Sequence, residues 1–296
     1  MNTTSAFISI IGRPNVGKSS LLNAMVGEKV AIVSAKPQTT RTRITGVLTR
    51  GETQLVFLDT PGMHKARTKL GENMVKAVES SIGDVDAAIL VVNPDTPLGE
   101  IEQGLLRSLA KRKLPCVLAV NKVDLLTDKT ALLACIARFQ HAYDFAEVIP
   151  VSAVTGEQLS ILLDAVTRFA KPGPHFFDED SYTDQPERVI VSEIVREKML
   201  NLLYEEIPHG TAVTVDSFKE RDDGIIDIHV TIFCEKKSHK GIIIGKGGQM
   251  LKKIGTAARL DMERFLGARV NLQCFVKVKE DWRNSDYLIR DLGLSQ

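Results

Sequence analysis

The sequence predicts an α/β domain with a mostly parallel sheet, followed by a smaller α+β domain. The chain has 296 residues, which is longer than a single hydrophobic core usually supports. From residue 6 to about 170, short apolar runs alternate with helical patterns, as is typical of a parallel sheet with helices on both faces. Beyond residue 187 the expected order of elements changes to αββααβ, so a second domain of a different class is predicted.

Five apolar runs are the expected parallel strands of the first domain: FISII, QLVFLD, AAILVV, CVLAV and EVIPV. Helical patterns accompany them in LLNAMV, residues 68–82, IEQGLLRSLAKRK, ALLACIARFQHAY and LSILLDAVTRFA. The segment RITGVLTRGETQLVFLD holds two strand patterns around Gly51, which predicts a tight turn and one antiparallel edge strand.

Residues 171–187 have the composition of a linker, with three prolines, five acids and one lysine. The predicted domains are therefore 1–170 and 188–296. In the second domain we expect six elements, in the order helix 188–206, strands 211–219 and 224–234, helices 238–244 and 249–266, and strand 269–279.

Residues 12–19, GRPNVGKS, fit the phosphate-binding pattern GxxxxGKS, and they lie between an expected strand and an expected helix. Glycines let the backbone N–H groups face phosphate oxygens, the lysine pairs with the β and γ phosphates, and the serine hydroxyl can bind Mg²⁺. The alternative is a glycine-rich turn without a ligand. The residues assigned to phosphate binding are Gly12, Arg13, Pro14, Asn15, Val16, Gly17, Lys18 and Ser19.

A second motif, DTPG at residues 59–62, ends the expected strand QLVFLD. Asp59 can hold Mg²⁺ through water, and the Gly62 N–H can meet the γ-phosphate. Met63 stands where a glutamine would orient the attacking water, so slow unaided hydrolysis is expected. We assign a nucleotide-dependent switch to Thr39, Thr40, Asp59, Thr60, Pro61, Gly62 and Met63.

Two details of this site stay open from the sequence pattern alone. Thr39 and Thr40 both lie in the loop before DTPG, and spacing does not decide which of them supplies a second Mg²⁺ ligand. Asn15, inside the phosphate loop, is a candidate ligand for K⁺ that would replace an arginine finger, but a turn-stabilising asparagine explains it equally well.

The motif NKVD at residues 121–124 selects the base. The Asp124 carboxylate can accept hydrogen bonds from N1–H and the N2 amino group of guanine, whereas adenine offers neither donor there. Asn121 is expected at the other base edge and Lys122 along the ring, while Ser152 or Ala153 brings a backbone N–H to guanine O6. The pattern therefore favours GTP over the ATP of a P-loop kinase.

Residues 236–253 carry six lysines and no acid, although the net charge of the whole chain is only +1. Their centre, GKGG at 245–248, predicts a loop between two helices where a sugar-phosphate backbone can approach closely. A charged helix pair with a flexible turn, or a patch that attracts anionic lipid, are the alternatives. The residues assigned to RNA binding are Lys240, Ile243, Ile244, Gly245, Lys246, Gly247, Gly248, Lys252 and Lys253.

Together, GRPNVGKS, QTTR, DTPG, NKVD and GKGG in this order resemble the bacterial Era family of GTPases over essentially the whole chain. The resemblance implies a P-loop GTPase domain, a KH-like domain of type II, and Thr40 as the metal ligand. It also implies binding to the 3′ end of 16S ribosomal RNA, assistance in maturation of the small (30S) subunit, and partial association with the inner membrane face.

The remaining expectations concern location and competing functions. The N-terminus lacks a signal-peptide pattern and no apolar run is long enough to span a bilayer, so a cytoplasmic protein is expected, with a monomer as the default. The main competing hypothesis is a membrane-surface signalling GTPase that docks on anionic lipid through the lysines. A GTPase of tRNA modification is a weaker one, because the chain has no matching catalytic domain.

Overall fold

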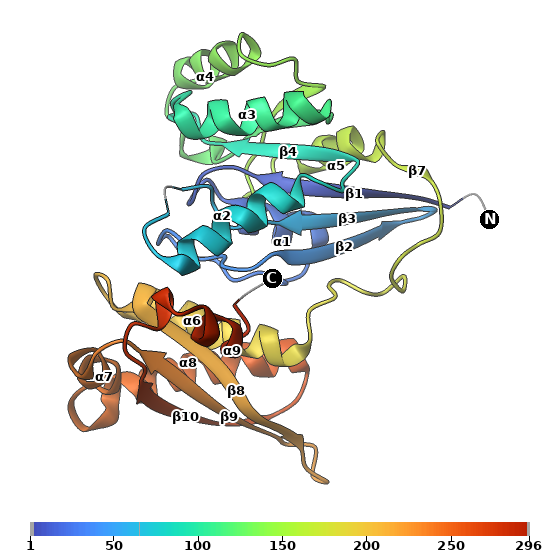
Figure 1. Ribbon diagram of the computed structural model, residues 1–296. Coiled ribbons are helices and arrows are strands. Elements are labelled where there is room, and N and C mark those ends of the chain that lie inside the picture. Colours follow the sequence, from blue (N-terminus) through green and yellow to red (C-terminus); the bar gives the residue numbers. More distant parts are fainter. Residues whose placement is uncertain (1–2, 65, 295–296) are drawn as a thin grey trace.

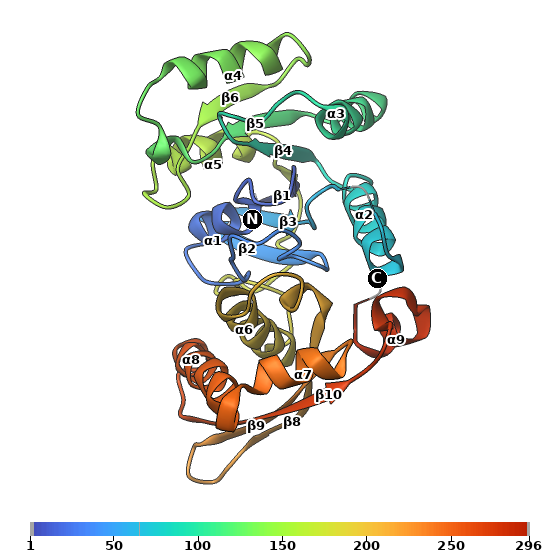
Figure 2. The same ribbon diagram turned by 90° about the vertical axis from the view of Figure 1, so that its left-hand side faces the viewer.

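The computed structural model describes residues 3–64 and 66–294, which form two domains stacked on each other (Figure 1). The N-terminal domain is built on a large, mostly parallel sheet and the C-terminal domain on a small three-stranded sheet. Figure 2 shows helix α6 (Glu187–Leu202) between the two sheets. The predicted fold class of both domains is confirmed.

The large sheet has the strand order β2-β3-β1-β4-β5-β6. Its strands are β1 Thr4–Ile11, β2 Ile44–Arg50, β3 Thr53–Asp59, β4 Ala87–Val92, β5 Cys116–Val120 and β6 Glu147–Pro150. Strand β2 pairs antiparallel with β3, as expected from the turn at Gly51, and the other neighbours on this path are parallel. Strands β4 and β5 are buried along their whole length, because AAILVV and CVLAV are apolar on both faces.

Helices cover both faces of this sheet and form two apolar cores. Helices α1 (Lys18–Val26) and α5 (Leu159–Thr167) pack on one face. The other face is covered by α2 (Lys69–Ser81), α3 (Glu100–Arg112) and α4 (Thr130–Gln140). The carboxyl ends of β1, β3, β5 and β6 therefore meet at one edge, and the sequence motifs lie at this edge.

The C-terminal domain has the predicted order αββααβ. After α6 come β8 Thr211–Glu220, β9 Ile226–Cys234, α7 Lys237–Ile244, α8 Gln249–Leu266 and β10 Val270–Val278. Strand β9 is central, antiparallel to β8 and parallel to β10. The first helix was expected to reach residue 206 but ends at Leu202, because Leu203 turns to extended backbone and its side chain enters the apolar core.

Two short C-terminal elements were not predicted. A 3₁₀ turn at Trp282–Asn284 precedes α9 (Asp286–Asp291), which begins at Ser285, whose hydroxyl accepts from the Leu288 N–H. Their apolar side chains pack on Leu70 and Met74 of α2, so a small apolar cluster joins the two domains. Trp282 is fully buried there and donates from Nε1 to the Gly210 carbonyl at 3.0 Å.

The segment between the domains is fastened to strands of the large sheet. Its short strand β7 (Lys171–Pro172) pairs antiparallel with β1. Buried Gln54 accepts hydrogen bonds from the N–H groups of Phe176 and Phe177 at 2.7 and 3.0 Å. Further along, the Val47 N–H donates to the Tyr182 carbonyl and the Thr183 hydroxyl to the Thr45 carbonyl. Residues 184–186 then lead into α6. The predicted domain limits remain a prediction.

Within the described ranges 3–64 and 66–294, no helix has the length and apolar character needed to cross a membrane.

Candidate functional site

The phosphate loop lies between β1 and α1 and requires both of its glycines. Gly12 and Gly17 have φ angles of 146° and 94°, in the region that side chains disfavour. A Cβ at Gly12 would lie 2.4 Å from the Val91 carbonyl oxygen, and one at Gly17 would lie 2.3 Å from Asn121 Nδ2. Because α1 begins at Lys18, the N–H groups of its first turn face this loop. The arrangement fits a phosphate chain.

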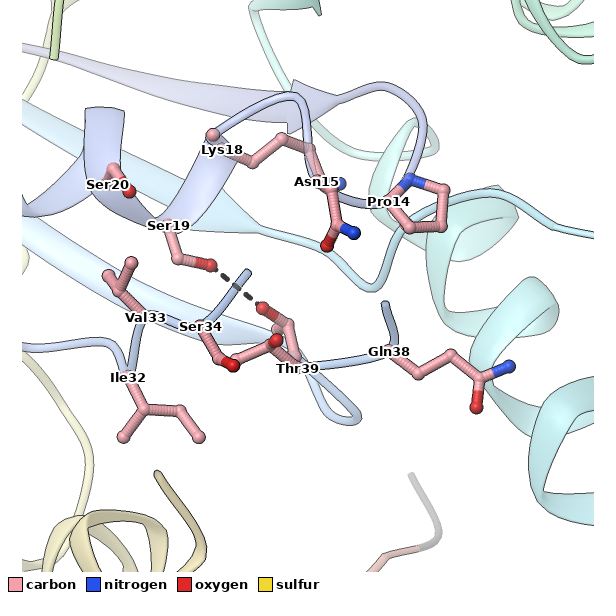
Figure 3. Close-up of a pocket in the computed structure, with 13 residues that line it drawn as sticks. Pro14, Asn15, Lys18, Ser19, Ser20, Ile32, Val33, Ser34, Gln38 and Thr39 are labelled. Carbon is pink, nitrogen blue, oxygen red and sulfur yellow. Dashed lines mark hydrogen bonds between the residues drawn. The ribbon is translucent and has the colours of Figure 1, made fainter. Parts of the chain in front are cut away.

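Lys18 is buried at the mouth of this loop (Figure 3). Its ammonium donates to the carbonyls of Gly12 and Arg13 at 3.2 and 2.9 Å. Burial lowers the pKa of Lys18 to about 8, while the nearby charge of Asp59 raises it. A polyphosphate, which carries several negative charges, is a stronger partner for this ammonium than two carbonyl groups. The Arg13 side chain, by contrast, turns away to an ion pair with Glu102 of α3.

Three oxygen-bearing side chains converge beside the lysine. The Ser19 hydroxyl donates to Asp59 Oδ2 at 2.6 Å and lies 2.8 Å from the Thr40 hydroxyl, the hydrogen bond drawn in Figure 3. The Thr40 hydroxyl in turn lies 3.3 Å from the same Asp59 oxygen. Thr39 instead donates its hydroxyl to the Lys36 carbonyl. Both threonines line the pocket, but Thr40 is the one whose hydroxyl joins this cluster of oxygen atoms.

The Asp59 carboxylate provides a test of whether Mg²⁺ fits. Asp59 is fully buried, and its Oδ1 has no hydrogen-bond partner within the described residues. Burial raises the pKa of Asp59, against the effect of the Lys18 charge and of hydrogen bonds from Ser19 and Thr40. A hard divalent cation prefers such oxygen ligands and would relieve the unpaired carboxylate oxygen. When bound, Mg²⁺ supplies positive charge against the phosphate oxygens.

The DTPG segment lies against the phosphate loop. A Cβ at Gly62 would lie 2.5 Å from the Pro14 nitrogen, and the Met63 N–H donates to the Gly12 carbonyl at 3.2 Å. Thr60 donates its hydroxyl to the Ile10 carbonyl. The Met63 side chain packs against the apolar core and carries no group that can orient a water molecule.

The NKVD residues join the phosphate loop to the base site. Asn121 donates from Nδ2 to the Val16 carbonyl at 2.9 Å, and Lys122 donates to the Asn15 carbonyl at 2.7 Å. The exposed Asp124 accepts from the Ser152 hydroxyl at 2.6 Å through Oδ1, and its Oδ2 can accept further hydrogen bonds. The Ala153 N–H, one of the two backbone donors expected near guanine O6, donates here to Asn121 Oδ1.

The tip of the phosphate loop also contacts the segment between α1 and β2. Asn15 has a φ of 65° and donates from Nδ2 to the Ala35 carbonyl at 2.9 Å. The side chain thus stabilises the turn and ties it to residues 27–43, which we name the switch loop. The Oδ1 atom of Asn15 remains available as a cation ligand.

The GKGG loop joins α7 to α8 in a conformation that suits glycine. Gly245, Gly247 and Gly248 all have positive φ angles, of 73°, 56° and 79°. A Cβ at Gly245 would lie 2.8 Å from Met250 Cβ, whereas Gly247 and Gly248 face open space. A backbone of phosphates can therefore come close to the loop, at the N-terminus of the 18-residue helix α8.

The lysines of this region are available for an anion. Lys246, Lys252 and Lys253 are exposed, and Lys240 is half-buried. None of the four forms an ion pair among the residues that the structure describes. The assignment of Ile243 to RNA binding is wrong for its side chain, which is fully buried in the domain core and cannot lie under a base. Ile244 is partly buried against the same core.

A groove next to the loop extends the site beyond the sequence prediction. It has a volume of about 310 Å³ and lies between α8 and β10. Lys252, Thr256 and Arg259 line it because they recur along one face of α8 at helical spacing. This spacing was visible in the sequence, but only the packing of β10 shows which face of α8 borders the groove.

Two family models match the chain. A model described as 50S ribosome-binding GTPase matches residues 7–122, and a KH domain model matches residues 206–283. GTPase Era of Ruminiclostridium cellulolyticum is 50% identical over 293 residues, which are 99% of this chain and 98% of that protein. This chain belongs to the Era family. It is therefore a GTPase, an enzyme that hydrolyses GTP to GDP and phosphate.

Other members of the Era family agree over the full length. GTPase Era of Clostridium novyi is 49% identical over 99% of both chains. Crystal structures of a point variant of Aquifex aeolicus Era bound to GDP.AlF4⁻, and of Era in complex with MgGDPNP and nucleotides 1506–1542 of 16S ribosomal RNA, each superpose with a TM-score of 0.95. Each is 34% identical, and the match covers 99% of this chain and all of theirs.

Replacement of Gly17 by alanine is expected to weaken GDP binding at least tenfold. The new Cβ would displace Asn121, whose two hydrogen bonds join the phosphate loop to the base site, and a loss of about 1.4 kcal/mol is already tenfold. Titration with a fluorescent GDP analogue measures the effect. Gly27→Ala is the matched control, since Gly27 also has a positive φ but meets no atom within 4 Å. Equal losses in both variants would contradict the prediction.

Replacement of Asp124 by asparagine is expected to change the preferred base. The amide loses two charged hydrogen bonds to guanine, each worth about 1.5–3 kcal/mol, so GDP binding should fall roughly 100-fold or more. Xanthine carries a carbonyl at C2 that accepts from the new amide, so binding of XDP should improve. Competition between GDP and XDP measures both changes, with Asp128→Asn as an exposed control. Unchanged preference would remove Asp124 from the base site.

Proposed function

We propose that this GTPase is a GTP-controlled RNA-binding switch in the biogenesis of the small ribosomal subunit. The observation that carries the proposal is the GKGG loop, whose three glycines with positive φ precede helix α8 in a segment that carries several lysines. Lipid headgroups require positive charge but no glycines, whereas a sugar-phosphate backbone benefits from both. RNA is therefore favoured over a membrane surface as the partner of this loop.

Support for ribosomal RNA comes from a relative. An Era protein 34% identical to this chain has been solved with nucleotides 1506–1542 of 16S ribosomal RNA. Because 16S RNA belongs to the small subunit, we propose its 3′ end as the partner and maturation of the 30S subunit as the process. The words "50S ribosome-binding" belong to a broad family model that matches only the first domain, so they do not select the subunit.

The two sites are proposed to act together. The switch loop, which carries Thr40, lies against α6 of the second domain, and α6 packs on α8, which begins at the GKGG loop. GTP with Mg²⁺ on Ser19, Thr40 and Asp59 orders the switch loop, and hydrolysis releases it. RNA should then bind more tightly in the GTP state, and RNA should by the same factor strengthen GTP binding.

Hydrolysis without a partner is proposed to be slow, since Met63 cannot orient water. We retain the residues assigned from the sequence to phosphate, guanine and RNA binding, except for the side chain of Ile243.

We also propose that K⁺ binds at Asn15 and that the protein is a cytoplasmic monomer. Peripheral contact with the inner membrane face is proposed as a secondary role. Anionic lipid would attract the same lysines that RNA uses.

Crosslinking to RNA tests the function. The purified chain is irradiated with total cellular RNA, once with a non-hydrolysable GTP analogue and once with GDP, and the bound fragments are sequenced. Enrichment of the 3′ end of 16S RNA, stronger with the analogue, is expected from the tighter GTP-state complex. Scattered fragments, equal in both states, would instead indicate a general polyanion surface and favour the membrane hypothesis.

Gly247→Asp is expected to abolish RNA binding more completely than Lys246→Ala. The aspartate puts a negative charge where phosphates approach, at a backbone conformation that Asp tolerates and in open space. Gly224→Asp, in the β8–β9 turn, is the matched control, because it also has positive φ and open surroundings. Filter binding to a 16S 3′ fragment measures the difference. Equal effects of Gly247→Asp and Lys246→Ala would mean that charge alone matters.

Hydrolysis of GTP is expected to run faster in KCl than in NaCl at equal ionic strength, because K⁺ at Asn15 would stabilise the charge of the transferred phosphoryl group. Asn15→Gly keeps a residue that accepts positive φ but removes the ligand oxygen, so the difference between the salts should disappear. Single-turnover rates measure this. If the parent protein hydrolyses GTP no faster in KCl than in NaCl, the proposed role of K⁺ at Asn15 is ruled out.

A further inference from the structure

One face of α6 forms hydrogen bonds with the switch loop. Glu193, Arg196 and Glu197 share this face because they are three and four residues apart on the helix. An adjacent apolar face, with Ile190, Val191, Ile194 and Val195, packs into the core of the second domain. Since α6 is anchored by this apolar face, its polar face has a fixed position.

Arg196 reaches the backbone next to the metal-ligand threonine. Its guanidinium is almost fully buried and donates from Nη2 to the Thr39 carbonyl. The Glu193 carboxylate holds the guanidinium through Nε at 2.7 Å and again through Nη2. The Thr39 carbonyl belongs to the planar peptide that leads into Thr40, so fixing this carbonyl fixes how Thr40 enters the site.

Contacts on the other side of Thr40 also come from the second domain. Arg41 is buried and donates to the carbonyls of Thr211 and His209 at 2.6 and 2.8 Å. Its guanidinium lies 5.7 Å from the centre of the Trp282 ring. Thr40 is thus flanked on both sides by residues whose positions the second domain determines.

The earlier part of the loop is held by Glu197. Its carboxylate accepts from the Val33 N–H at 3.0 Å and from Lys29 at 2.8 Å. Burial would raise the pKa of Glu197, but hydrogen bonds from Lys198, Lys29 and the Val33 N–H hold it below the ordinary value. The carboxylate is therefore charged, and α6 touches the loop at both ends.

We propose that Arg196 is a positioning residue for GTP hydrolysis, which acts from the second domain by holding the Thr39–Thr40 peptide so that the Thr40 hydroxyl faces Ser19 and Asp59. The inference goes beyond the RNA switch, because it needs neither RNA nor the GKGG loop. It rests on the metal-ligand role of Thr40, and the experiment below separates the two.

The contact of Arg196 depends on the state of the loop. Its Nη1 is buried and has no hydrogen-bond partner in the described part of the chain. If Thr40 moved away, Nη2 would lose the Thr39 carbonyl as well, and a buried guanidinium with fewer partners is costly. The domains would then loosen to admit water. Arg196 thereby links the position of Thr40 to the closeness of the two domains.

The test is single-turnover GTP hydrolysis by the full chain. Arg196→Gln should slow hydrolysis about tenfold, since a misplaced catalytic group costs one to two orders of magnitude. The Mg²⁺ concentration for half-maximal rate should rise. Affinity for GDP should stay unchanged, because Thr40 is proposed to bind the metal only in the GTP-bound state, where the γ-phosphate is also present. Arg196→Lys, which keeps one charged donor, should recover part of the rate.

The control and the double variant decide the interpretation. Arg188→Gln removes a cation of the same helix that bonds the Val215 carbonyl inside the second domain, and it should hydrolyse GTP normally. In a Thr40→Ala background, Arg196→Gln should cause little further loss, because both changes remove one interaction. The proposal would be overturned if the rate loss of the double variant equalled the product of the two single losses. It would also be overturned if Arg196→Gln hydrolysed GTP at the parent rate. A normal rate of Thr40→Ala would instead overturn the role of Thr40.

Discussion

The carboxylate of Asp59 is the constraint on which the arrangement of the nucleotide site depends. It is a charge at the end of a buried strand, so the fold must place compensating groups around it. Lys18 supplies the opposite charge, and Ser19 and Thr40 supply hydroxyl groups. These groups come from two separate segments, the phosphate loop and the switch loop, and meet the carboxylate at the end of β3. The second carboxylate oxygen, Oδ1, still has no hydrogen-bond partner among the described residues. Because this oxygen is unpaired, the cluster can bind a cation and is not a closed hydrogen-bond network.

The contact between the domains has a different physical character from their cores. Besides the small apolar cluster around Trp282 and the ion pair between Lys69 and Asp286, the interface includes hydrogen bonds and ion pairs that connect the switch loop to α6, β8 and α8. Interfaces of this polar kind resemble transient complexes more than a domain core. Two guanidinium groups, Arg41 and Arg196, are buried here close to each other, and each repels the other. Many of the contacts that hold the closed arrangement are therefore made to one loop, and the stability of that arrangement depends on the conformation of the loop.

Much of the fold and of the nucleotide site could be predicted because their signals are local. Apolar runs mark the strands, and each motif places its residues within a few positions of a strand end, as Lys18, Asp59 and Asp124 illustrate. Spacing alone could not choose between Thr39 and Thr40, because adjacent residues in a loop point in directions that no periodicity fixes. The family resemblance favoured Thr40, and the structure places the Thr40 hydroxyl beside Ser19 and Asp59. Ile243 was misassigned because a run of three isoleucines does not reveal which one faces the core. Arg196 left no signal at all, since its partner Thr39 is 157 positions away.

The anchoring of the connecting segment has a consequence for how the domains behave at different protein concentrations. The chain is fastened to the large sheet as far as Thr183, and only residues 184–186 lie between that anchor and α6. Three residues span at most roughly 10 Å. When the interface opens, the second domain therefore stays beside the switch loop at a high effective concentration. Closure is an intramolecular event whose equilibrium is insensitive to dilution. An interface too weak to hold two separate molecules together is sufficient here, and it can reopen with each turnover.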